Sequence, residues 1–91
     1  MEQAVRLKVY GLVQGVGFRW ATRRLAVQLV IVGFVINETD GSVSIEAQGE
    51  EMNIRKFITQ IEIGPSNGTK VHHVKIASVG VNPDYTTFKI Y

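Results

Sequence analysis

The stretch from residue 11 to residue 19 combines residue types that could bind an anion: three glycines, Gly11, Gly15 and Gly17, followed by Arg19. Glycine permits main-chain conformations closed to other residues, so such a loop can direct several N–H groups at one point. The unpaired N–H groups of a helix that starts there would favour a phosphate, and Arg19 in its first turn is unfavourable without an anion nearby. From the residues alone, a plain tight turn is the alternative interpretation.

The sequence lacks the residues that several other kinds of functional site require. Gly17 is followed by Phe18, Arg19 and Trp20 where a dinucleotide fingerprint requires a further glycine or alanine, and the Gly-Lys-Ser/Thr of a Walker motif is absent. The chain has no cysteine, which removes disulfides, thiol nucleophiles and thiolate metal ligands. Two adjacent histidines, at positions 72 and 73, fall on a predicted strand and point to opposite faces, so they cannot share one metal ion. We therefore expect no metal and no cofactor.

The glycine-rich loop joins a predicted strand to a predicted helix. Alternating apolar residues indicate a strand over about residues 4 to 13, and apolar spacings of three and four indicate an amphipathic helix from Phe18 to Leu29. Two more strands are predicted at residues 32 to 36 and 42 to 48, with a hairpin turn at Asp40-Gly41 between them. The candidate anion site is thus expected at the N-terminus of the first helix.

The second half of the chain continues the same alternation of elements. Helical spacing from residue 50 ends at Gly64-Pro65, and strands follow at residues 71 to 79 and 86 to 91. This order predicts an α+β fold, the ferredoxin-like βαββαβ sandwich, in which an antiparallel sheet carries both helices on one face and a short extra strand at its C-terminal end. With no linker or repeat, residues 1–91 are expected to form a single domain.

Charge and hydropathy limit the location and partners of the chain. The first 36 residues hold five basic side chains against one acidic, and the rest hold five against seven, so the front half attracts anions. The longest apolar run, Leu29 to Ile36, is too short to cross a bilayer. No export signal is visible at the first residues, and we expect a cytoplasmic protein that does not bind membranes.

Two long motifs closely resemble those of the acylphosphatase family. They are the stretch from Gly11 to Ala26, which contains Gln14-Gly15-Val16-Gly17-Phe18-Arg19, and the stretch from Gly33 to Val43; residues 46–49 and Gly64-Pro65 extend the match. The resemblance implies hydrolysis of the carboxyl–phosphate bond of acyl phosphates, with inorganic phosphate as product and phosphate or sulfate as inhibitor. The sequence does not define an oligomeric state, and a monomer is the simplest expectation. It implies that Arg19 and Asn37 are catalytic. The substrate phosphate would be bound by Gln14, Gly15, Val16, Gly17, Phe18 and Arg19.

A few positions depart from the family pattern or invite another role. Val30 stands where relatives usually have a helix-ending glycine, so the helix must end without a left-handed residue or with strain of about 1 kcal/mol or more. Phe34 replaces a common tryptophan and Ile36 a commonly basic residue, which could change substrate affinity. Trp20 either covers the site or packs against the protein, and we expect packing. Arg23 is expected on the solvated face of its helix; the alternative is that it adds to the positive field over the phosphate site.

Two other classes of function compete with hydrolysis. RNA-binding proteins of this fold display aromatic residues on their middle strands, but residues 42 to 48 include none, so we expect no nucleic-acid binding. A non-catalytic module or accessory domain that binds acyl or carbamoyl phosphate without releasing it is the other alternative. Release of inorganic phosphate from an acyl phosphate separates an enzyme from such a binder.

Overall fold

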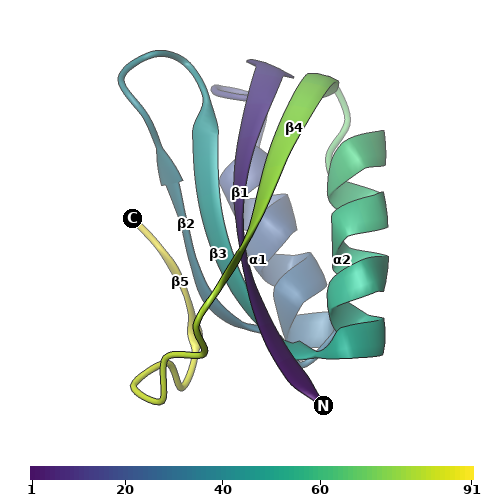
Figure 1. Cartoon of the computed structure of the whole chain (residues 1–91). Coiled ribbons are helices and arrows are strands. Elements are labelled where there is room, and N and C mark those ends of the chain that lie inside the picture. Colours follow the sequence, from purple (N-terminus) through teal and green to yellow (C-terminus); the bar gives the residue numbers. More distant parts are fainter.

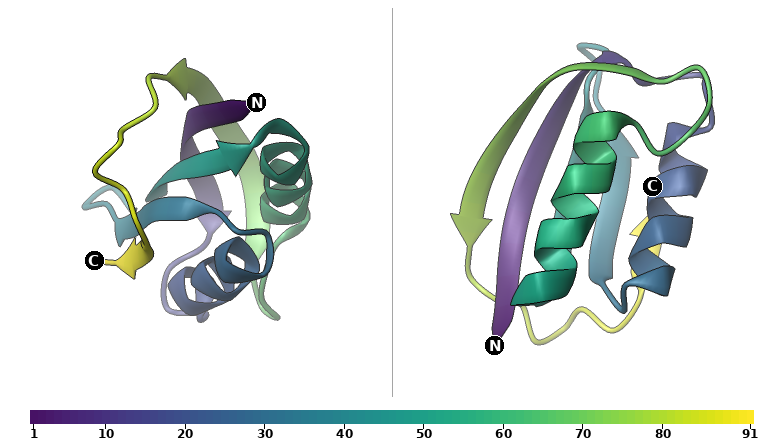
Figure 2. Two further views of the ribbon diagram at one scale, coloured as in Figure 1. Left: turned by 90° about the horizontal axis from the view of Figure 1, so that it is seen from below. Right: turned by 90° about the vertical axis from the view of Figure 1, so that its right-hand side faces the viewer.

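Two helices lie side by side on one face of a five-stranded sheet in a computed structural model of the chain, which describes residues 1–91 (Figures 1 and 2). The element order is the predicted one, with the additional strand at the end. In chain order the elements are β1 (Glu2–Leu12), α1 (Phe18–Gln28), β2 (Val32–Asn37), β3 (Val43–Glu50), α2 (Glu51–Ile63), β4 (Lys70–Val79) and β5 (Phe88–Ile90).

The sheet has the strand order β4-β1-β3-β2-β5. All neighbouring strands are antiparallel except β2 and β5, which run parallel with Gly33 opposite Phe88. The central pair, β1 and β3, is in register from Glu2 opposite Glu50 to Val9 opposite Val43. This arrangement, with both helices on one face, confirms the ferredoxin-like fold.

The core lies between the helices and the sheet. Alternate residues of the central strands, such as Leu7, Val9 and Ile45, face the helices and are fully buried, as the period-2 pattern predicted. Phe57 of α2 packs against Phe88 of β5 with ring centroids 6.3 Å apart, which ties the short last strand to the core. Burial of each large side chain stabilises the fold by roughly 1.5–3 kcal/mol.

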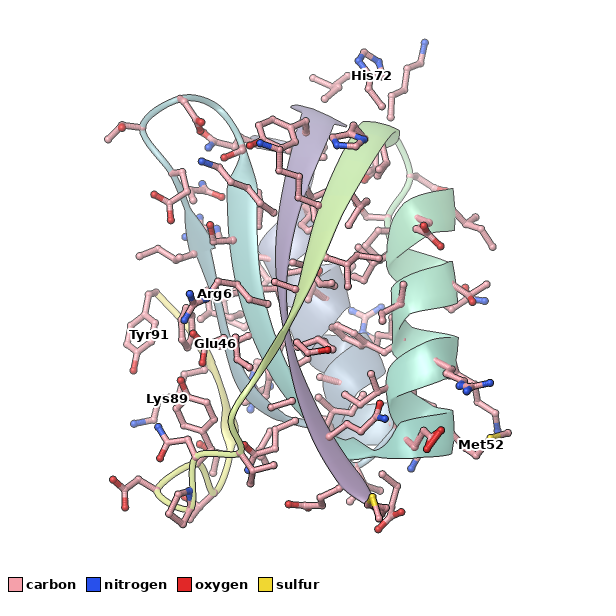
Figure 3. All side chains as sticks on the ribbon, in the orientation of Figure 1. Arg6, Glu46, Met52, His72, Lys89 and Tyr91 are labelled. Atoms are coloured by element: carbon pink, nitrogen blue, oxygen red, sulfur yellow. The ribbon has the colours of Figure 1, made fainter.

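The far face of the sheet is not covered by a helix and carries paired charges. The Arg6 side chain points toward Glu46 across β1 and β3, and its Nη2 lies 2.7 Å from a carboxylate oxygen (Figure 3). Tyr85 donates to the other oxygen of Glu46 at 2.7 Å. Burial raises the pKa of Glu46, but the hydrogen bonds from Arg6 and Tyr85 outweigh it and leave this pKa below its usual value.

The pairing of β1 with β4 is irregular near the end of β1, just before the glycine-rich loop. The register of β1 with β4 shifts between Tyr10 and Gly11, where Gly11 has a φ of 135°. A Cβ at Gly11 would lie 2.1 Å from the Lys70 carbonyl oxygen, so only glycine fits this close approach. The first glycine of the motif therefore shapes the strand, and the other two shape the loop.

Helix α1 ends with strain at Val30. Val30 has a φ of 55°, the only positive φ of a residue other than glycine. Its N–H donates to the Val27 carbonyl at 3.2 Å and the Ile31 N–H donates to the Ala26 carbonyl at 2.8 Å, the two bonds of a Schellman motif. Of the two alternatives predicted for this position, the structure adopts the strained left-handed one.

Element ends differ modestly from the predictions. β1 starts at Glu2 and ends one residue before Val13, and β5 contains three residues instead of six. Glu50 belongs to β3 and only Glu51 lies in the first turn of α2. Strand ends depend on the partner strand, which periodicity along one segment does not contain.

Candidate active site

The loop between β1 and α1 has alternating main-chain conformations. Gly15 and Gly17 have φ values of 75° and 74°, whereas Val16 between them is not in the positive region. A Cβ at either glycine would meet no atom within 4 Å, so conformation rather than space requires glycine here. Successive residues that alternate in this way form a concave main-chain nest whose N–H groups can bind an anion.

Helix α1 begins directly at this loop and its N-terminus is free of side-chain caps. Gly17 is the N-cap, and no side chain accepts a hydrogen bond from the first turn. The first turn also contains no acidic residue. The N–H groups at the start of a helix have no intrahelical acceptor and carry partial positive charge, so they are available to a bound anion.

Arg19 is half-buried in the first turn of α1 and is held by the chain just beyond β5, the edge strand against which α1 packs. Its Nη1 donates to the main-chain oxygen of Tyr91, just beyond β5, at 2.8 Å. One turn later, Arg23 is exposed, as expected for the solvated face of α1, and its Nε also donates to the Phe88 carbonyl at 3.2 Å. The Tyr91 ring packs edge-on against Phe34, with centroids 5.7 Å apart. β5 thus positions both arginines.

Asn37 is the last residue of β2, where the strand enters its hairpin. Its Oδ1 is buried and has no hydrogen-bond partner in the protein. Such an atom is uncommon in native structures and often marks a functional position. The hairpin itself is well ordered by hydrogen bonds, since Asp40 accepts from both the N–H and the hydroxyl of Ser42.

One pocket of about 130 Å³ brings these parts together. This volume is several times what one water requires, so the pocket has room for a small anion. The loop, the first turn of α1 and the end of β2 all contribute to its walls. Its lining residues are Val13, Gly15, Gly17, Phe18, Arg19, Trp20 and Asn37. Both predicted catalytic residues and three of the other predicted phosphate-binding residues therefore face one space.

Two predicted phosphate-binding residues do not line this pocket. The Gln14 amide nitrogen donates to the Glu38 carbonyl at 2.8 Å and to the Ser42 carbonyl at 2.9 Å. Both of its N–H donors are then used, which leaves the main-chain N–H as its possible contribution to an anion. The Gln14 side chain instead ties the loop to the hairpin after Asn37. Val16 makes its contacts on the outer side of the loop.

The sequence favoured the wrong role for Trp20 and predicted none for Ser66. Trp20 is 66% exposed and lines the pocket, so the expected packing is wrong and the structure fits the alternative, in which Trp20 covers the site. Ser66, in the loop after α2, donates to the Val16 carbonyl at 3.0 Å. The two residues are 50 positions apart, and no local pattern signals such a contact.

The hairpin beside Asn37 is also fixed electrostatically. Hydrogen bonds from the Ser42 hydroxyl and N–H, and from Lys8, lower the pKa of Asp40 to about 2. Lys8 lies 3.2 Å from this carboxylate. Asp40 is therefore ionised over the whole neutral and mildly acidic range, where it holds the turn that follows Asn37.

Neither a metal cluster nor a membrane span is present among the described residues. No three side chains of His, Asp or Glu gather closely enough to hold a metal ion. His73 stacks on the Tyr10 ring with centroids 5.9 Å apart, and His72 lies at the end of the sheet where β4 begins (Figure 3). Neither helix has the length and apolar character that crossing a bilayer needs.

The fold and the pocket define a ferredoxin-like protein in which a glycine-rich loop, a helix N-terminus and an arginine line one pocket. Residues 5–90 match the family model described as Acylphosphatase. An acylphosphatase of Lactobacillus gasseri is 48% identical over 88 residues, which is 97% of each chain. The chain belongs to the acylphosphatase family, and it is an enzyme that hydrolyses acyl phosphates.

Solved structures agree with this assignment. The crystal structure of an acylphosphatase from Bacillus subtilis is 32% identical and superposes with a TM-score of 0.93 over 100% of this chain and 99% of that one. Full-length HypF, in its phosphate- and nucleotide-bound form, matches at 33% identity and a TM-score of 0.91, with 100% of this chain covering 12% of that chain. The same fold thus occurs in a protein about this size and within a much longer one.

Proposed function

We propose that hydrolysis proceeds by in-line attack of a water held by Asn37 on a phosphate bound by residues 14–19 and Arg19. The observation that carries the proposal is the single pocket lined by the loop glycines, Arg19 and Asn37. Main-chain N–H groups and one guanidinium would bind the phosphoryl oxygens. The carboxamide on the neighbouring wall would hold the nucleophile.

The leaving group explains why so few residues can suffice. An acyl phosphate releases a carboxylate, whose parent acid has a pKa near 4, so no general acid has to protonate it at neutral pH. Phosphoryl transfer passes through a loose transition state with charge on the equatorial oxygens, and catalysis is then mainly positioning and electrostatic stabilisation. Fixed N–H donors and a guanidinium supply both.

Arg19 suits this task better than a lysine would. Its planar guanidinium can donate to two phosphate oxygens at once and stays charged at any working pH. The bond from Nη1 to the Tyr91 main-chain oxygen restricts its orientation and leaves other N–H groups of the guanidinium for substrate. A preorganised cation of this kind stabilises developing charge without reorganisation during the reaction.

Asn37 supplies a neutral donor and acceptor for the attacking water. Its Oδ1 has no partner in the protein, so a hydrogen-bonded water would satisfy the amide and be oriented by it. Holding the water in line with the breaking bond converts a bimolecular encounter into a positioned step. Asn37 would therefore act on turnover rather than on phosphate affinity.

We further propose that the enzyme acts without a metal, as a cytoplasmic monomer, with inorganic phosphate or sulfate as a competing ligand. One chain provides every wall of the pocket, and the leaving group needs no Lewis acid. The absence of cysteine fits a reducing compartment. Equal rates of phosphate release from benzoyl phosphate with and without EDTA would support metal independence, and a rate abolished by EDTA would contradict it.

The central test is Arg19→Ala, assayed by release of inorganic phosphate from benzoyl phosphate. Removal of one preorganised charge stabiliser should lower kcat/KM by at least about 10²- to 10³-fold. Arg24→Ala is the matched control, because Arg24 is an exposed arginine on the same helix and does not line this pocket. Near-normal hydrolysis by Arg19→Ala would exclude the assignment. The same assay separates an enzyme from a module that only binds.

A further inference from the structure

The phosphate-binding loop is held in place from outside the pocket. Two of its residues, Gly15 and Gly17, are exposed glycines, and glycine has more conformational freedom than any other residue. Tight phosphate binding requires the N–H groups to point inward before the ligand arrives. Gln14 fixes one end of the loop against the hairpin, and the middle of the loop needs a second contact.

That second contact comes from the loop between α2 and β4. The Ser66 hydroxyl lies 3.0 Å from the Val16 main-chain oxygen and 2.6 Å from the Thr69 hydroxyl. A carbonyl only accepts, so Ser66 must donate its single proton to Val16. Thr69 must then donate to Ser66. The two hydroxyls form a directed chain that ends on the loop.

Because the peptide bond is planar, the contact at the Val16 carbonyl also fixes the direction of the Gly17 N–H. The Val16 carbonyl and the Gly17 N–H belong to one trans peptide and point in opposite directions. Ser66 and Val16 do not line the pocket, whereas Gly17 does. A carbonyl held outward by Ser66 therefore directs the Gly17 N–H toward the space where phosphate would bind.

The surrounding fold brings the two loops together. The loops after β1 and after α2 lie at the same end of the molecule, and the second passes over the start of α1 (Figure 2). A Cβ built at Gly68 would lie 3.8 Å from the Val16 side chain, so Gly68 faces the first loop at close range. Gly64, with a φ of 107°, ends α2 and starts the segment that supplies Ser66.

We propose that Ser66, oriented by Thr69, is a positioning residue that sets the direction of the Gly17 N–H and thereby the affinity of the loop for phosphate. The inference rests on the proposed role of residues 14–19. Ser66 touches no substrate and acts only through the Val16 peptide. It should therefore affect phosphate binding more than it affects overall stability.

The test measures the Kd of inorganic phosphate for Ser66→Ala by NMR titration, with the Gly17 amide signal as reporter. A hydrogen bond of ordinary net strength corresponds to a loss of about 3- to 10-fold in affinity. Thr69→Val should weaken phosphate affinity by about 2-fold, because Ser66 keeps its hydroxyl but loses the hydrogen bond that orients it. Thr69→Ser should keep the wild-type affinity for phosphate. The phosphate-induced shift of the Gly17 amide should shrink in Ser66→Ala.

Thr59→Ala is the matched control. The Thr59 hydroxyl donates to the Arg55 carbonyl at 3.1 Å in α2, a bond of the same kind that does not reach the loop. Its loss should leave phosphate affinity unchanged. If Ser66→Ala bound phosphate as tightly as the wild type, or if Thr59→Ala weakened binding equally, the inference would be overturned. If Ser66→Ala did not fold, Thr69→Val and Thr69→Ser would replace it, and equal phosphate affinity of Thr69→Val and the wild type would then overturn the inference.

The outcome is separable from that of the proposed function. A wild-type chain that binds phosphate at Gly17 yet releases none from benzoyl phosphate would overturn the proposed mechanism while the Ser66 comparison still stood. Normal hydrolysis together with an unchanged Ser66→Ala affinity would overturn only the positioning role. A wild-type chain without phosphate binding at this loop would overturn both.

Discussion

Val30→Gly should stabilise this protein, because Val30 ends α1 in a conformation that glycine adopts without strain. The residue has a φ of 55° and completes both hydrogen bonds of the Schellman motif. Its N–H and main-chain direction are unchanged in the variant. The substitution therefore removes the side chain and keeps the helix end.

The expected gain follows from three contributions. A left-handed conformation costs an L-residue about 1–2 kcal/mol, and a β-branched residue is among the least tolerant. Glycine removes this strain but costs about 0.5–1 kcal/mol through the greater freedom of the unfolded chain. Val30 is 78% exposed, so little burial is lost. The net stabilisation is about 1 kcal/mol, which raises Tm by roughly 4–8 °C in a domain of this size.

Thermal and urea unfolding of the purified variants measure this gain. Val27→Gly is the control, since Val27 is also exposed, at 57%, but lies inside α1 with ordinary helical geometry. That variant should lose about 0.5 kcal/mol from lower helix propensity. A rise in stability for Val30→Gly and a fall for Val27→Gly, from the same Val-to-Gly substitution, would identify backbone strain as the cause. A lower Tm for Val30→Gly, or equal shifts for both variants, would refute the reasoning.

Two further predictions concern Asn37 and its hairpin. Asn37→Ala should leave the Kd of phosphate within about 2-fold and lower kcat by about 10²-fold or more, because the amide aims water; weakened phosphate binding with normal turnover would contradict this. Asp40→Asn should destabilise the protein at neutral pH. The pKa of Asp40 is lowered from 3.8 to about 2, so the stabilisation from its ionised carboxylate is complete above pH 4 and is lost as the pH falls through 2. Urea titrations should show the difference in stability between variant and wild type closing over that range. A difference that stays constant with pH would contradict the prediction.

Much of the site could be predicted from one short stretch of sequence. Glycines at positions 15 and 17 next to Arg19 indicate a main-chain anion site, because only glycine adopts the observed φ values easily and only a bound anion favours a cation in that turn. The role of Asn37 came from the resemblance to a family and not from its own chemistry. An asparagine before a turn is common for purely structural reasons.

The order of the elements also followed from the sequence. Period-2 alternation in β1 and β3 and helical spacing in α1 and α2 are local patterns, and each segment has only one face that it can bury. Five strands and two helices of this length then have few ways to cover one another. The antiparallel sheet with both helices on one face is the outcome of that limited choice.

Only the tertiary structure decided how the loop and its arginine are held. The bonds from Gln14 to the hairpin, from Ser66 to Val16 and from Arg19 to the Tyr91 main chain join residues 24 to 72 positions apart. Side-chain types and local spacing carry no information about such partners, since they depend on which chain ends and loops the packed sheet brings to one end of the molecule. The structure also decided between the two endings predicted for α1, since Val30 adopts the left-handed conformation that an L-residue ordinarily avoids.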